Sequence, residues 1–236
     1  MLCKIADLIT EIPDKEGLCS LCEDYLWNGG ESADVVIRAD CYRPEKYGPN
    51  ASEDDIAYME SARQFCQELL YRDGLYLHAS AVELEGRAYL FSGDSGVGKS
   101  THTRLWRQVF GETAQVINDD KPALRCLNGM WYAYGTPWCG KDHINRNRKV
   151  PLAGICFLKQ SEHNTIRRLT SQEVIQRIMS QTMHKFSSMD RLDLMLGHLE
   201  KLVEMIPFYE LENRPEPEAA HLSYEMMRRG AEEMGL

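Results

Sequence analysis

The chain has 236 residues, of which 43% are hydrophobic and 27% are charged. This is the composition of a globular protein with a substantial core, and it excludes disorder as the main state. Because 27 Lys and Arg face 36 Asp and Glu, the net charge is −9, and the molecule as a whole repels nucleic acid and acidic membrane surfaces. We therefore expect neither as a partner, although a small local basic site is compatible with this charge.

The beginning of the chain, MLCKIADLITEIPDKEG, is interrupted by Lys4, Asp7 and Glu11 and has no apolar stretch of signal-peptide length. The longest uncharged runs, 127–140 and 151–158, are shorter than the roughly 18 residues that a membrane helix needs. We expect a cytoplasmic protein whose eight cysteines are reduced thiols. Cys19 and Cys22 form a single CxxC pair, which we interpret as buried thiols rather than a metal or redox site.

Residues 1–50 are expected to form a small N-terminal α+β lobe: a strand, a helix, and a short strand over 33–40. A polar, turn-rich stretch follows, and residues 51–236 are assigned to a second, larger domain. Ser52 and Asp55 have the spacing of a capping box with a shorter acid, and apolar residues at helical spacing then predict a helix that extends to Leu69.

The region 73–160 is rich in predicted strands. Segments 75–84 and 87–93 flank Glu85 and Gly86, and a second pair of strands turns at Asn128 and Gly129. Residues 99–110 are expected to be helical and 114–118 to be a short strand. The nearly all-apolar run 150–158 is typical of a strand buried on both faces, so a mixed sheet is expected.

The C-terminal region is predicted to be helical. A capping box at Thr170 and Glu173 begins one helix, and a Leu and Met stripe over 192–206 predicts a second. A predicted strand at 208–212 precedes a last helix that begins at Pro217 and is expected to end near Gly230. We interpret all the apolar stripes as core.

Residues 93–100, GDSGVGKS, match the phosphate-binding pattern GxxxxGK[ST] between a predicted strand and a predicted helix. Glycines let the backbone N–H groups turn inward, Lys99 can reach the β- and γ-phosphates, and the Ser100 hydroxyl can bind Mg²⁺. The alternative is a glycine-rich turn without function. The candidate nucleotide-binding residues are Gly93, Asp94, Ser95, Gly96, Val97, Gly98, Lys99, Ser100 and Thr101.

Two adjacent acids, Asp119 and Asp120, follow the predicted strand 114–118. Neighbouring residues of a strand point to opposite sides, so the two carboxylates have different tasks unless the strand has already ended. One can bind metal while the other meets the substrate, and a solvated turn is the alternative.

The stretch from His78 to Asp120, with HAS, FSGDSGVGKSTHT and NDDKPAL, resembles the catalytic domain of HPr kinase/phosphorylase and the related phosphoenolpyruvate carboxykinase nucleotide fold. GTPWCGK, VPLAGICFL and RPEPEAAHLSYE are similar to the small HPr kinase-like proteins of bacteria. The likeness covers about residues 73–230. It implies an α/β mixed-sheet P-loop fold with C-terminal helices, and a P-loop kinase domain over 51–236.

The resemblance also implies roles for individual residues. Lys99 and Ser100 would bind MgATP, Asp120 would be a metal ligand, and Asp119 would be the base that takes a proton from an attacking hydroxyl. A family His on the strand before the loop matches His78, which by itself would be interpreted as a core or hairpin histidine. His102, inside the following helix, is expected to be a surface or packed residue.

Phosphoryl transfer also needs a second positive group. The segment GTPWCGKDHINRNRK offers Lys141, Arg146 and Arg148, and Lys141 is preferred because Gly140 permits a close approach of the chain. A basic, solvated loop is the alternative.

We therefore expect a serine-type kinase that uses ATP and Mg²⁺. Its acceptor is expected to be a hydroxyl group on a peptide, a carrier protein or a small molecule. The chain could also form a homo-oligomer. A nucleotide-dependent regulatory module is the alternative, and reversal with phosphate or pyrophosphate stays open. Because counterparts of the downstream metal-binding Glu and the HPr-docking loop are not identified, HPr itself is not the expected acceptor, and the small size of the chain argues against decarboxylation.

Overall fold

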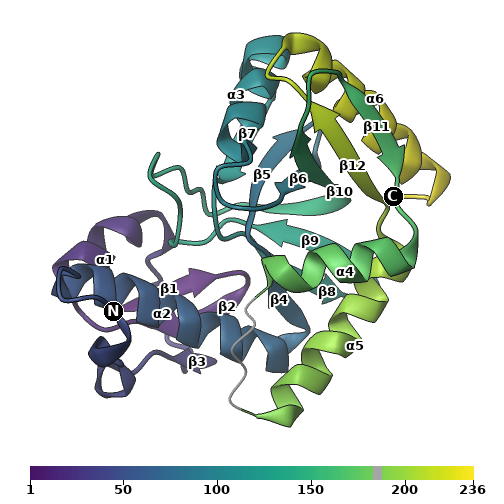
Figure 1. The fold of residues 1–236 in the computed structure, drawn as a ribbon. Coiled ribbons are helices and arrows are strands. Elements are labelled where there is room, and N and C mark those ends of the chain that lie inside the picture. Colours follow the sequence, from purple (N-terminus) through teal and green to yellow (C-terminus); the bar gives the residue numbers. More distant parts are fainter. Residues whose placement is uncertain (183–187) are drawn as a thin grey trace.

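The computed structural model describes residues 1–182 and 188–236 and contains two β-sheets (Figure 1). The smaller sheet lies at the N-terminal end and has the order β1-β2-β3. Its strands are β1 (Leu2–Ile5), β2 (Leu8–Glu11) and β3 (Val35–Val36). Helices α1 (Glu16–Leu21) and α2 (Glu53–Leu69) accompany it, and α2 begins with the predicted capping box of Ser52 and Asp55.

Two predictions in the N-terminal region are wrong in detail. A hairpin of β1 and β2 stands where a single first strand was predicted. Ala6 and Asp7 reverse the chain with left-handed φ values of 51° and 60°, and the sequence has no glycine there to indicate a turn. The strand predicted over 33–40 is reduced to Val35–Val36. Buried side chains of β1, β2 and α1 form one hydrophobic cluster with α2, Tyr134 and Trp138, so the N-terminal residues share a core with the larger sheet.

The larger sheet has the order β4-β8-β9-β10-β6-β5-β7, and β12 pairs with both β10 and β11. Parallel pairs β10–β6 and β10–β12 combine with antiparallel pairs elsewhere, so the predicted mixed α/β sheet is confirmed. Its strands are β4 (Gly74–Tyr76), β5 (Ala79–Leu84), β6 (Arg87–Ser92), β7 (Gln115–Asn118), β8 (Ala123–Leu127), β9 (Met130–Tyr134), β10 (Lys149–Gln160), β11 (Thr165–Arg168) and β12 (Phe208–Asn213).

Both predicted two-residue hairpin turns are present. Glu85 and Gly86 have φ values of 53° and 73°, and Asn128 and Gly129 have values of 52° and 76°, which suit the twist of the flanking strands. The segment 75–84, predicted as one strand, is divided because β4 pairs with β8 whereas β5 pairs with β6 and β7. His78 lies in the break between them.

Helices cover both faces of the larger sheet (Figure 1). On one face α3 (Lys99–Phe110) and α6 (Pro217–Glu233) enclose a cluster around Trp106, and on the other α4 (Ser171–Gln181) and α5 (Met189–Met205) enclose a cluster around Leu199. Alternate residues of β10 enter the two clusters, with Ile155 in one and Cys156 in the other. The apolar run 150–158 is therefore buried on both faces, as predicted. No helix within the described residues has the length and apolar character needed to cross a membrane.

The last helix differs from its prediction. α6 continues through Gly230 to Glu233, and Gly230 is buried inside it rather than ending it. A Cβ atom at this position would lie 1.7 Å from the hydroxyl oxygen of Tyr209 on β12. The glycine is therefore needed for the close packing of α6 on the sheet.

We expect Gly230→Ala to lower the free energy of unfolding by about 1–3 kcal/mol, because the methyl group forces α6 away from Tyr209. Gly197→Ala on α5 is the matched control: a Cβ there meets nothing within 4 Å, so the same exchange should be neutral or stabilise by roughly 0.5–1 kcal/mol. Urea denaturation followed by circular dichroism measures both values. Equal effects of the two variants would contradict this account of α6 packing.

Candidate functional site

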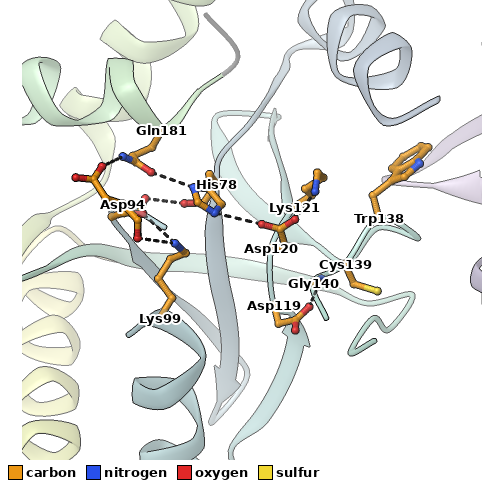
Figure 2. Close-up of polar contacts among 12 residues, drawn as sticks. His78, Asp94, Lys99, Asp119, Asp120, Lys121, Trp138, Cys139, Gly140 and Gln181 are labelled. Carbon is orange, nitrogen blue, oxygen red and sulfur yellow. Dashed lines mark hydrogen bonds and ion pairs between the residues drawn. The ribbon is translucent and has the colours of Figure 1, made fainter. Parts of the chain in front are cut away.

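The candidate site is assembled by strand direction. β5 runs antiparallel to both β6 and β7, so the end of β6, the start of β5 and the end of β7 meet at the same edge of the sheet. The loop 93–98 follows β6, His78 precedes β5, and Asp119 and Asp120 follow β7. Three segments that are separate in the sequence are thereby brought to one place (Figure 2).

The loop 93–98 joins β6 to the N-terminus of α3, as predicted. Gly93, Gly96 and Gly98 have φ values of 140°, 83° and 111°, which residues with a Cβ rarely adopt, so these glycines are required for the shape of the loop. Gly98 is also the N-cap of α3. The helix N-terminus and the loop together form the arrangement that proteins use for phosphate.

The Lys99 side chain folds back over this loop. It is 8% exposed, and its ammonium donates to the carbonyl oxygens of Gly93 at 2.9 Å and Asp94 at 3.2 Å. Burial lowers the Lys99 pKa, and the negative charges of Asp120 and Asp94 partly oppose this effect. Because its direct partners are neutral carbonyl groups, the buried cation is available to an anion placed in the loop.

Asp120 points toward this loop and is paired with two neighbours. Its Oδ1 atom lies 3.2 Å from Nε2 of His78, and its Oδ2 atom forms an ion pair with Lys121 (Figure 2). Burial alone would raise the Asp120 pKa, but the hydrogen bond from His78 and the charge of Lys121 outweigh it and hold the pKa at about 2. The carboxylate is thus ionised at neutral pH.

Gln181, at the end of α4, connects His78 to the loop 93–98. Its Oε1 atom lies 3.2 Å from Nδ1 of His78, and its Nε2 atom donates to Oδ1 of Asp94 at 3.1 Å (Figure 2). The backbone N–H of His78 also donates to the Gln181 carbonyl at 2.8 Å. Sequence reasoning missed Gln181, because nothing in an apolar helical stripe indicates a contact across 103 residues of chain.

The Asp119 side chain does not share the partners of Asp120 and is directed toward Gly140 instead. One carboxylate oxygen accepts a hydrogen bond of 2.6 Å from the backbone N–H of Gly140, and the side chain lies beside the segment that contains Cys139 (Figure 2). A Cβ at position 140 would lie 3.0 Å from Oδ2 of Asp119, so glycine permits this approach. Burial is the largest cause that raises the Asp119 pKa, and the nearby charge of Asp120 adds to it.

The buried side chain of Asn118 sets the direction of both acids. Its carboxamide oxygen accepts from the backbone N–H groups of Asp120 at 3.0 Å and Lys121 at 2.7 Å, and its nitrogen donates to the carbonyls of Thr136 and Trp138. β7 ends at Asn118, so the two acids lie in a turn and not in a strand. The buried Asn118 amide is therefore the group that shapes the turn.

The three candidate cations of the segment 141–148 have different surroundings. Lys141 is exposed on the loop after Gly140, Arg148 forms a bidentate ion pair with Glu83, and Arg146 is bonded to Gln115. The cation beside the acids is Lys121, whose ammonium pairs with Asp120 and lies 3.3 Å from the hydroxyl of Tyr58. Lys121 directly follows Asp119 and Asp120 in the sequence, and this position is the feature by which it could have been identified as a site residue.

His102 is packed, as expected. It is 1% exposed, its Nε2 atom lies 3.0 Å from the hydroxyl of Ser223, and burial lowers its pKa to about 3.

Cys22 is buried and its partner in the CxxC pair, Cys19, is half-buried beside Asp14. All eight cysteines lie among the described residues and are free thiols.

Mg²⁺ is usually held by one or two carboxylates together with substrate phosphates and water. Within the described residues no group of three or more His, Cys, Asp or Glu side chains could hold a metal by itself. The donors that suit Mg²⁺ here are the ionised carboxylate of Asp120 and the half-buried hydroxyl of Ser100 in the first turn of α3. Both are oxygen donors, the kind of ligand that Mg²⁺ prefers in proteins.

Residues of the loop line two open pockets. One of about 550 Å³ is lined by the loop and by Arg177 and Gln181 of α4. Another, of about 620 Å³, is lined by Thr101, Gln160 and Arg214 among others. Both are within the usual size of small-ligand sites.

The family model described as "SynChlorMet cassette protein ScmC" matches residues 50–214. The chain belongs to this family. The match includes the loop, the Asp pair and Gln181 of the chain. The comparison with curated proteins finds no match.

Among solved structures, the HPr(Ser) kinase/phosphatase from Coxiella burnetii is similar at 13% identity, over 68% of this chain and 92% of that chain, with a TM-score of 0.39. Because so low a TM-score carries no argument about activity, the functional assignment depends on the residues of the site.

The pairing of Asp120 predicts a pH-dependent stability. The folded-state pKa of about 2 is below the ordinary value of 3.8, so the stabilisation is present above about pH 4 and is lost as the pH falls toward 2. It is on the order of 2 kcal/mol. We expect Asp120→Asn to reduce the unfolding free energy at pH 7 and to differ less from the wild type at pH 3, measured by urea denaturation. A difference that is the same at both pH values would contradict this role of the carboxylate.

Proposed function

We propose that this protein is a phosphotransferase that uses ATP and Mg²⁺. It would transfer the γ-phosphate to a hydroxyl group, that of a serine in a peptide or small protein or an equivalent hydroxyl of a small molecule. The observation that carries the proposal is the meeting, at one sheet edge, of the β6–α3 loop with two acids that have different surroundings. The eight free thiols fit a reducing compartment, and we propose a cytoplasmic location.

The loop and Lys99 would hold the β- and γ-phosphates, with backbone N–H groups and the N-terminus of α3 directed at the anion. Ser100 and Asp120 would hold Mg²⁺, which neutralises charge on the phosphates when it is bound. Asp120 suits this task because it stays ionised at neutral pH.

Asp119 would act as the base. Its pKa is raised, which brings a carboxylate closer to the pH at which it works, and its second oxygen is not engaged by Gly140. As the hydroxyl oxygen forms a bond to the γ-phosphorus, the bond from that phosphorus to the bridging oxygen breaks and ADP leaves. The hydroxyl proton moves to Asp119, so atoms and charge balance.

His78, Gln181 and Lys121 would act as positioning residues. His78 and Lys121 hold the Asp120 carboxylate, and Gln181 joins His78 to Asp94 of the loop. A catalytic role for Lys141 stays a proposal, since its exposed loop position permits contact with an acceptor or a phosphate.

A second candidate function is a nucleotide-dependent regulatory module. Hydrogen bonds continue from Asp94 through Gln181, His78, Asp120 and Lys121 to Tyr58 of α2, whose hydroxyl donates to the Cys139 carbonyl at 2.5 Å. A nucleotide in the loop could act on the N-terminal elements through these contacts. A passive binder, however, has no need of a second buried acid.

Isothermal titration calorimetry with MgATP, combined with transfer of labelled phosphate to serine-containing acceptors, tests the proposal. We expect Lys99→Ala to lose nucleotide affinity and turnover, and Asp119→Asn to keep the affinity while losing transfer by about 100-fold or more. Lys201→Ala, at an exposed position of α5, is the control and should behave as the wild type.

Absence of MgATP binding to the wild-type protein would refute the proposal. Loss of ATP affinity in Asp119→Asn would refute the assignment of the base. Binding without transfer to any acceptor, together with large nucleotide-dependent changes in hydrogen exchange on α2, would favour the regulatory module.

A further inference from the structure

An open pocket of about 520 Å³ lies between the second half of α3, the beginning of β7 and the loop that follows β9. Its charged lining consists of Arg104, Arg107 and Arg146 against the single acid Glu112. The other side chains with polar groups are Gln108 and Gln115. We call this the arginine pocket. It is a locally basic site on a chain whose net charge is −9.

The arginines of this pocket are accessible to a ligand. The Arg107 side chain is exposed and makes no hydrogen bond or ion pair with any other described residue. The Arg104 side chain is 63% exposed and contacts Asp142 at 2.5 Å. Among the described residues, the guanidinium of Arg146 bonds only to the neutral amide oxygen of Gln115. An incoming carboxylate would therefore meet positive charge that is only partly compensated.

The arginine pocket is built on the same two segments as the surroundings of Asp119. The Arg146 backbone N–H donates to the carbonyl of Ile117 at 2.9 Å, two residues before Asp119. Asp142, the partner of Arg104, follows two residues after Gly140, which binds Asp119. From Gln115 to Asp119 a strand spans roughly 13 Å, a distance that about four residues of extended peptide cover.

We propose that the arginine pocket binds an acidic segment of a peptide acceptor, about three to five residues from the hydroxyl that is presented to Asp119. The inference depends on the proposed function for the identity of that hydroxyl. Arginine pairs with carboxylates through two parallel hydrogen bonds, which suits Glu and Asp side chains. A short acidic segment needs only the local field, because charges more than about 8–10 Å away are screened, whereas a nucleic acid would extend over the acidic remainder of the surface.

The test measures binding, not turnover. The probe is a fluorescein-labelled peptide with one serine followed, after three glycines, by four glutamates, and the matched peptide has glutamines instead. By fluorescence anisotropy at about 50 mM salt with MgATP, we expect the glutamate peptide to bind at least about tenfold more tightly. Arg107→Glu should weaken it at least about fivefold. Arg229→Glu, the same charge reversal at a 63% exposed position of α6, should have less than a twofold effect.

Equal binding of the two peptides, no detectable binding of either, or equal effects of Arg107→Glu and Arg229→Glu would overturn the inference. So would tighter binding of a single-stranded oligonucleotide that Arg107→Glu also weakens. A preference for the acidic peptide without MgATP binding or transfer would refute the proposed function and leave the arginine pocket as an acidic-peptide site. Phosphate transfer without a preference for the acidic peptide would support the proposed function and refute the arginine pocket as an acidic-peptide site.

Discussion

The antiparallel pairing of β5 with both β6 and β7 is the constraint on which the site depends. It brings the end of one strand, the start of the next and the end of a third to the same edge, so the loop 93–98, His78 and the Asp119–Asp120 turn meet without long connections. Strands buried on both faces hold that edge in place, since β10 contributes to the clusters on either side of the sheet. The geometry of the site is therefore set by the core.

The different surroundings of two adjacent acids follow from one buried amide. Asn118 binds the backbone of the turn with its oxygen and the 136–138 segment with its nitrogen, so Asp120 is directed at His78 and Lys121 while Asp119 meets Gly140. Burial would raise both pKa values, but at Asp120 the hydrogen bond from His78 and the charge of Lys121 reverse the effect. The proposed division between metal binding and proton transfer depends on these two shifts of opposite sign.

Much of the local structure could be predicted because its signals are short-range. Both capping boxes, both two-residue hairpin turns and the helix after GDSGVGKS depend on residues within a few positions of each other. The turn at Ala6 and Asp7, the break at Leu77 and His78 and the continuation of α6 through Gly230 were not predicted. Each depends on a partner far away in the chain, as Gly230 does on Tyr209.

The sequence by itself determined the mixed α/β class, the glycine loop with Lys99 and Ser100, and the presence of two acids after a strand, because pattern and residue type are sufficient for these. Only the tertiary structure decided that Lys121 lies beside Asp120, that Gln181 joins His78 to Asp94, and that Asp119 lies against Gly140. These contacts join segments up to 103 residues apart. They arise from strand order and burial, which one-dimensional patterns do not specify.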